Sequence, residues 1–156
     1  MSADQTSVPV SAADIASAAL AATAMPTDSD TADAMAQLAD VAGHASTALF
    51  NYRRNNPDAP DIDRALNLEM TLDLRAIDLR VKAVKLLGDQ SAQAIAQLKD
   101  AAGKVDDFFA GVKKIEGQLA IASAVIGLAG AALVGDAGGI LSAVVGVHTA
   151  LKAAQA

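Results

Sequence analysis

The chain contains no cysteine and no tryptophan, and aromatic residues make up only 3% of it. The absence of cysteine excludes disulfide frameworks, thiolate zinc sites and cysteine nucleophiles. The sequence also lacks the runs of β-branched residues with alternating apolar and polar positions that mark β-strands. Alanine, the strongest helix former, instead provides 38 of the 156 residues. The composition therefore predicts an all-α protein that is long enough to bury a core within one domain.

Basic residues are too few and too scattered to form a positive stripe. The formal net charge is −6, of which residues 1–60 carry −5 and residues 61–116 carry −1. The last forty residues hold only Asp136 and Lys152 as charged groups. Because neutralisation of phosphates supplies most of the affinity for nucleic acids, we expect no nucleic-acid partner.

The pattern of a secretory signal peptide is missing as well. Asp4 comes early, and no lysine or arginine precedes Ile15. We therefore expect synthesis in the cytoplasm, while export by a signal-free route or association with a membrane stays open. Residues 1–10 are predicted to be disordered.

The rest of the chain, residues 11–156, is predicted to form a single helical domain. Pro26 and the segment 55–60 are strong helix breaks, and the capping residues at 27–31 suit a helix start. The predicted helices cover residues 11–25, 30–55, 61–87, 90–116, 117–134 and 139–153.

A heptad-like line of apolar and small residues runs through the third and fourth of these helices. Its large members follow a spacing of three and four residues, which is typical of a packed helical seam. They are Leu74, Ile77, Val81, Val84, Ile95, Leu98, Val105, Phe109 and Val112. A break at Gly88 predicts an elongated up-down bundle with coiled-coil-like packing, whereas an unbroken phase predicts one rod over residues 61–134. The matching helix lengths favour the bundle.

Residues 117–135 and 137–151 carry no charge, and residues 117–151 hold seven of the eleven glycines. The segment 135–139 reads as a turn, so we predict a C-terminal hydrophobic helical hairpin with Asp136 at its tip. Four-residue spacing places two rows of small residues on its legs. The first row is Ser123, Gly127, Ala131 and Gly135, and the second is Gly138, Ser142, Gly146 and Ala150. We expect the two rows to face each other, as small residues do in helices that pack in lipid.

Large apolar residues on the other faces of the two legs need an apolar cover. One hypothesis is that a membrane covers them when the hairpin leaves a soluble fold, with Lys113, Lys114 and Lys152 held together on one side. The arrangement, over residues 117–151 only, is similar in outline to α-helical pore-forming toxins and pore-forming bacteriocins, a resemblance of physical pattern without a shared motif. It implies a pore-forming or membrane-perturbing component. The alternative is a structural or interaction module, of which a secretion-associated protein is one form, that has the hairpin as its core and assembles with itself or with a helical partner.

Residues that could carry chemistry are sparse. His44 and His148 have no carboxylate or histidine three or four residues further along, so a metal pair on one helix face is not expected. Asp28, Asp30 and Asp33 lack the glycine and terminal glutamate of a calcium loop, and helix capping explains them better. We expect no catalytic, cofactor or metal site, and we expect that the protein is not an enzyme.

Overall fold

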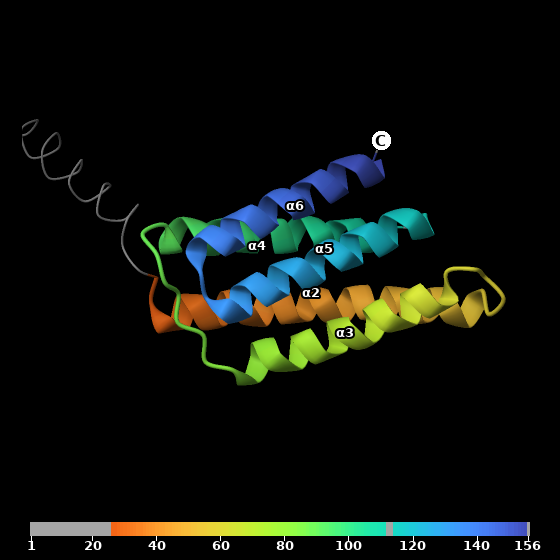
Figure 1. The fold of residues 1–156 in the computed structure, drawn as a ribbon, viewed down its shortest axis with the longest axis horizontal. Helices are drawn as coiled ribbons and strands as arrows, with labels where there is room; N and C mark the ends of the chain where they lie inside the picture. Colours follow the sequence, from red (N-terminus) through yellow and green to blue (C-terminus); the bar gives the residue numbers. More distant parts are fainter. Residues whose placement is uncertain (1–25, 112–113, 156) are drawn as a thin grey trace, which may run out of the picture.

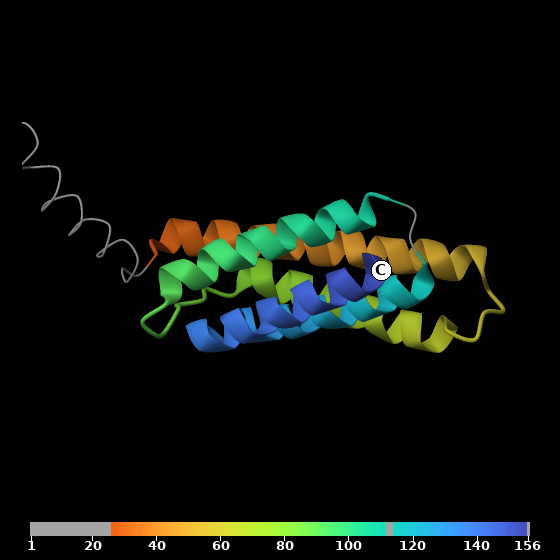
Figure 2. The same cartoon turned by 90° about the horizontal axis from the view of Figure 1, so that it is seen from above.

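The computed structural model describes residues 26–111 and 114–155. In these residues the chain forms five α-helices and no β-strand, which confirms the all-α prediction. The helices lie alongside one another in an elongated bundle (Figures 1 and 2). They are α2 (Asp28–Asn55), α3 (Ile62–Val81), α4 (Ser91–Phe109), α5 (Ile115–Val134) and α6 (Ala137–Gln155). The disorder predicted over residues 1–10 and the helix predicted over 11–25 lie outside the described residues.

Local signals set both ends of α2. The Thr27 hydroxyl accepts a hydrogen bond from the Asp30 amide at 3.0 Å, and the Asp30 carboxylate accepts one from the Thr27 amide at 3.4 Å. This reciprocal capping box satisfies two amides that the helix itself leaves unpaired. Arg53 and Arg54 occupy the last turn, where cations are favoured. The helix ends at the predicted residue, directly before the proline-containing turn.

The third helix ends at Val81, six residues before the predicted end at 87. Residues 82–90 form an extended connection, here called the α3–α4 linker. The linker turns Leu86 into the core, where its side chain is 2% exposed, and it reverses at Gly88, which has a φ of +111°. Ser91 then starts α4 and donates its hydroxyl proton to the Gly88 carbonyl at 2.7 Å. The continuous rod over residues 61–134 is therefore wrong, and the bundle is the observed arrangement.

A second break separates α4 from α5. The helix predicted to run to residue 116 stops at Phe109, and α5 begins at Ile115. The next helix, α6, begins at Ala137, two residues before the predicted start, and continues to Gln155. Both legs of the hairpin are therefore longer than the uncharged stretches of sequence that predicted them.

Alanine and leucine form most of the core. The longest helix, α2, contacts α3, α4 and α5, while α6 packs on α5 and α4 at the edge of the bundle. Alanines at the contacts let the helix axes approach closely, as Ala42, Ala101 and Ala129 illustrate, since none of them is exposed. The fully buried large side chains lie between these layers and include Leu38, Leu49, Leu72, Leu98, Leu119, Ile121, Leu128 and Ile140.

The heptad-like seam does not form one packed line. Its second half lies in the core, because Ile95, Leu98 and Val105 on α4 are at most 5% exposed. Its first half meets solvent on α3, where Leu74, Ile77 and Val81 are more than half exposed. Val84 and Phe109 are partly buried against the core, and Val112 lies outside the described residues. The prediction of a continuous seam is wrong because the linker turns the two halves toward different surroundings.

Candidate functional site in the C-terminal hairpin

The two C-terminal helices form the predicted hairpin. Their hydropathy and length would allow each to cross a membrane, with mean hydropathy of 1.9 for α5 and 1.3 for α6. A core helix of a soluble protein passes the same test, so burial is informative here. Only 39% of the apolar window of α5 and 28% of that of α6 are buried. Both helices therefore have one face on the bundle and one face on solvent.

Glycine and aspartate build the tip of the hairpin. Gly135 ends α5 in the left-handed region with a φ of +83°, and its amide donates to the Ala131 carbonyl at 3.1 Å. Asp136 then caps α6, because its carboxylate accepts a hydrogen bond from the Gly139 amide at 2.9 Å. The side chain of Asp136 is exposed. The predicted turn with Asp136 at its tip is thus present, and each residue in it has a local reason.

The α3–α4 linker holds this tip against the bundle. The Leu87 amide donates to the Gly135 carbonyl at 2.7 Å, and the Ala137 amide donates to the Leu87 carbonyl at 2.9 Å. The fit is close, since a Cβ atom built on Gly135 would lie 2.6 Å from the Lys85 carbonyl oxygen. The linker and the tip are fifty residues apart in the sequence, and no local pattern predicts that they pair.

The bundle covers the large side chains of the hairpin. Leu119 on α5 is 1% exposed, and Ile126 and Leu133 pack partly buried against the core. On α6 the inward face is more complete, with no member above 5% exposed: Ile140, Val144, Val147 and Leu151. The cover that these residues require is supplied to α5 by α2 and α3, and to α6 by α5 and α4.

The two rows of small residues do not face each other, and this prediction is wrong. Ser123 and Gly127 on α5 are exposed, Ala131 is partly buried, and Gly135 alone is buried, against the linker. On α6 the row is exposed or half-buried throughout: Gly138, Ser142, Gly146 and Ala150. Added Cβ atoms at Gly127 and Gly146 would meet nothing within 4 Å. Small side chains lie outward because in water the large apolar groups gain most from burial.

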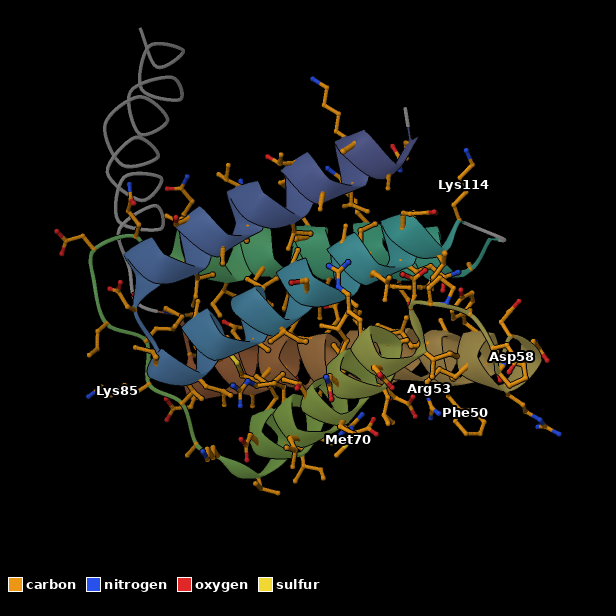
Figure 3. The ribbon with its side chains drawn as sticks, turned by 45° about the vertical axis from the view of Figure 1, so that its right-hand side comes forward. Phe50, Arg53, Asp58, Met70, Lys85 and Lys114 are labelled. Atoms are coloured by element: carbon orange, nitrogen blue, oxygen red, sulfur yellow. The ribbon has the colours of Figure 1, made fainter. Side chains whose placement is uncertain are left out.

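The open end of the hairpin carries its lysines. The two legs are adjacent there, because a Cβ atom on Gly117 would lie 3.1 Å from the Cβ atom of Ala154. Lys114 directly precedes α5 and is exposed (Figure 3). Lys152 is exposed in the last turn of α6. These two predicted anchors therefore lie at the same end, opposite Asp136, while Lys113 lies outside the described residues.

Histidines and acids pair across helices, which sequence spacing did not reveal. His44 on α2 contacts the carboxylate of Asp106 on α4. His148 on α6 lies 3.9 Å from a carboxylate oxygen of Asp100, which Lys104 approaches to 3.1 Å. These pairs are exposed and join neighbouring helices. Spacing along one helix cannot detect partners that belong to different helices.

One ion pair with a pKa shift links α2 to α3. The Arg53 guanidinium donates to the Glu69 carboxylate at 2.7 Å. This hydrogen bond, together with the negative charge of Glu69, raises the pKa of Arg53 above its ordinary value. The pair fixes the α2–α3 contact and lies far from the hairpin tip.

Hollows lie on the surface of the bundle, and one of about 450 Å³ is lined by the His44–Asp106 pair. A larger one, of about 620 Å³, lies between the start of α2 and the linker and is lined by residues such as Met35, Leu79 and Val84. Another, of about 440 Å³, lies beside His148 and Lys104. In the described ranges no three histidine, aspartate or glutamate side chains gather as metal ligands would.

In comparisons with known proteins, no family model, no curated protein and no solved structure matches the chain.

Proposed function

We propose that this chain is a non-catalytic, membrane-associating helical protein that holds an apolar hairpin on the side of a water-soluble bundle. The supporting observation is the face that α5 and α6 turn to solvent. Residues 117–135 and 137–151 place no charge on it, and more than half of each apolar window is exposed or only partly buried. Water-facing helices ordinarily carry charged residues on their outer faces. A surface without them suits contact with lipid.

The dimensions of the hairpin fit this proposal. The 20 residues of α5 and the 19 residues of α6 span about 30 Å and 28 Å, close to the thickness of the hydrocarbon core. In an inserted hairpin Lys114 and Lys152 would stay at one interface while Asp136 leads. Carrying a carboxylate across lipid is costly, so insertion would be conditional rather than permanent.

Release of the hairpin would invert its two faces. Ile140 and Val144, which now contact the bundle, would turn to lipid tails, and the rows that include Gly127 and Gly146 would become available for close helix packing. We propose this sequence of events for a chain made in the cytoplasm that reaches a membrane surface, where it would perturb the bilayer or form a pore.

Gly127→Lys tests the proposal without disturbing the fold. Gly127 is exposed and a side chain there meets nothing within 4 Å, so the folded bundle accepts a lysine. In an inserted hairpin the same lysine would lie in mid-membrane and lower partitioning about a hundredfold. Gly103→Lys on α4 is the matched control, because Gly103 is also a helical glycine with nothing within 4 Å.

The measurement is flotation of the full chain with anionic and neutral vesicles, together with release of an entrapped dye. We expect the wild-type chain and Gly103→Lys to float and Gly127→Lys to stay in solution. Absence of flotation between about pH 4 and pH 8, where carboxylates and histidines titrate, would remove the proposal. Equal flotation of all three chains would contradict the claim that the hairpin mediates binding to the vesicles.

A second candidate is a structural or interaction module in which the hairpin never leaves the bundle. It is favoured by the burial of the whole inward face of α6, where Val147 is not exposed and Leu151 is 5% exposed. Hydrogen exchange separates the two candidates. Under this second function, amides of α5 and α6 remain as protected with vesicles as without them.

A further inference from the structure

One helix presents a continuous apolar stripe to solvent. Met70, Leu74, Ile77 and Val81 on α3 are 56%, 60%, 57% and 72% exposed. They are spaced by four, three and four residues, so they lie on one face over three turns. This set is here called the α3 stripe. The other large exposed apolar residues of the described chain do not share a helix face with it: Phe50, Leu87, Val134 and Val145.

The α3 stripe lies on the side of α3 that points away from the bundle. The inward side of the same helix is marked by Ala65, Leu72, Ala76 and Leu79, none more than 5% exposed. They pack toward α2 and α5. Met70 lies on the outer side of α3, away from the hairpin (Figure 3). An apolar seam at heptad spacing on an outer helix face is typical of a surface that packs on another helix.

We propose that the α3 stripe binds a second copy of this chain, with the two α3 helices antiparallel about a twofold axis. The observed spacing places Leu74 opposite Ile77 of the partner subunit and Met70 opposite Val81 of the partner subunit. A twofold axis repeats both contacts, so four apolar layers form from the four stripe residues. This inference does not depend on the membrane function, because it uses a face remote from the hairpin.

Charges beside the stripe select this orientation. In heptad terms Met70 and Ile77 take position d, Leu74 and Val81 take position a, and Asp73 and Arg80 take position g. Antiparallel helices bring g residues together, so Asp73 meets Arg80 of the partner subunit twice in the dimer. Parallel helices would instead bring g beside e, which places Asp73 against Asp78 of the partner subunit. Opposite charges thus favour the antiparallel dimer and like charges oppose the parallel one.

Arg80 already has a partner within its own chain, and this partner does not block the dimer. Its guanidinium contacts the carboxylate of Asp40 on α2, and the two side chains are 50% and 63% exposed. Pairs as exposed as this contribute little stability. A guanidinium has five N–H donors, so Arg80 can bridge Asp40 and the partner's Asp73.

The size of the stripe sets the expected strength. It covers twelve residues from 70 to 81, or about 18 Å of helix. A contact along so short a helix segment buries less area than the interface of a stable obligate dimer. We therefore expect a reversible dimer with a Kd of about 100 µM. Sedimentation velocity of the full chain across a concentration series about this value measures it.

Ile77→Lys and Val145→Lys form a matched pair. Both replace an exposed β-branched residue by lysine, at 57% exposure on α3 and 64% exposure on α6. We expect Ile77→Lys to weaken the dimer at least tenfold, because it places a charged group among the apolar layers of the interface. We expect Val145→Lys to leave the dimer unchanged. A wild-type chain that stays monomeric throughout, or equal weakening by both variants, overturns the proposal.

Asp73→Arg tests the orientation. In the antiparallel dimer it opposes Arg80 of the partner subunit and weakens association several-fold, while in a parallel dimer it would meet Asp78 and strengthen association. The double variant Asp73→Arg with Arg80→Asp should restore the wild-type Kd. Strengthening by Asp73→Arg alone, or no restoration by the double variant, overturns the antiparallel arrangement.

Discussion

The amide of Leu87 donates a hydrogen bond to the carbonyl of Gly135 at 2.7 Å, which joins the α3–α4 linker to the hairpin tip. The return bond from Ala137 to the Leu87 carbonyl makes this a two-point contact. Among the described residues, this contact ties the outer hairpin to the rest of the bundle through backbone atoms. Changes that loosen it should therefore affect the hairpin first.

Gly135→Ala should destabilise the protein by about 1 to 3 kcal/mol. The new Cβ atom would lie 2.6 Å from the Lys85 carbonyl oxygen, and the left-handed φ of +83° disfavours any side chain. Urea unfolding measures the change, and hydrogen exchange at Leu87 and Ala137 should rise. The control is Gly130→Ala within α5, where nothing lies within 4 Å and helix propensity predicts a gain of about 0.5 to 1 kcal/mol. Equal effects of the two variants would contradict the close fit at the tip.

Leu86→Ala should cost about 3 kcal/mol, because it removes a side chain that is 2% exposed. Its neighbour Leu87 is 60% exposed, so Leu87→Ala should change stability by less than about 0.5 kcal/mol while it keeps the backbone bonds. If the hairpin is released through the linker, Leu86→Ala should also bind vesicles more strongly than wild type in flotation. Unchanged vesicle binding by a destabilised Leu86→Ala would separate linker opening from membrane association.

Helix ends with local causes could be predicted from the sequence. The start of α2 follows from the capping residues around Thr27, and the hairpin turn follows from Gly135 and Asp136. The end of α3 at Val81 could not be predicted in this way. Residues 82–87 are good helix formers, but burial of Leu86 and pairing of the linker with the tip outweigh that propensity.

Residue spacing identified which residues share a helix face, but not whether that face points to the core or to solvent. The four-residue rows with Gly127 and Gly146 do share a face on each leg, yet most of their members are exposed to solvent. The prediction that they meet used the logic of lipid, where small residues gain most from close contact, whereas in water the large residues are the ones that bury. The heptad phase from Leu74 to Phe109 is likewise regular across the break between α3 and α4, so the phase alone could not locate that break.

Thr27→Ala should destabilise the protein by about 1 kcal/mol, because it removes the hydroxyl that accepts the Asp30 amide at 3.0 Å. Ser29→Ala is the control in the same turn, since Ser29 is exposed and its change should stay within about 0.5 kcal/mol. Thermal unfolding followed by circular dichroism measures both variants. A cap that contributes nothing would leave the two midpoints equal.

Two adjacent valines on α6 lie on opposite faces of the helix, one toward the bundle and one toward solvent. Val144 is 3% exposed against the bundle, and Val145 is 64% exposed. Val144→Asp should cost more than about 3 kcal/mol, because an unpaired carboxylate would be buried, while Val145→Asp should cost at most about 0.5 kcal/mol. Urea unfolding of both variants measures the difference, and hydrogen exchange shows whether Val144→Asp frees α5 and α6 alone or unfolds α2–α4 as well. Free α5 and α6 on an intact α2–α4 body would make the hairpin a separable unit, as membrane insertion requires. A larger cost at Val145 than at Val144 would mean that the two faces of α6 are reversed in solution.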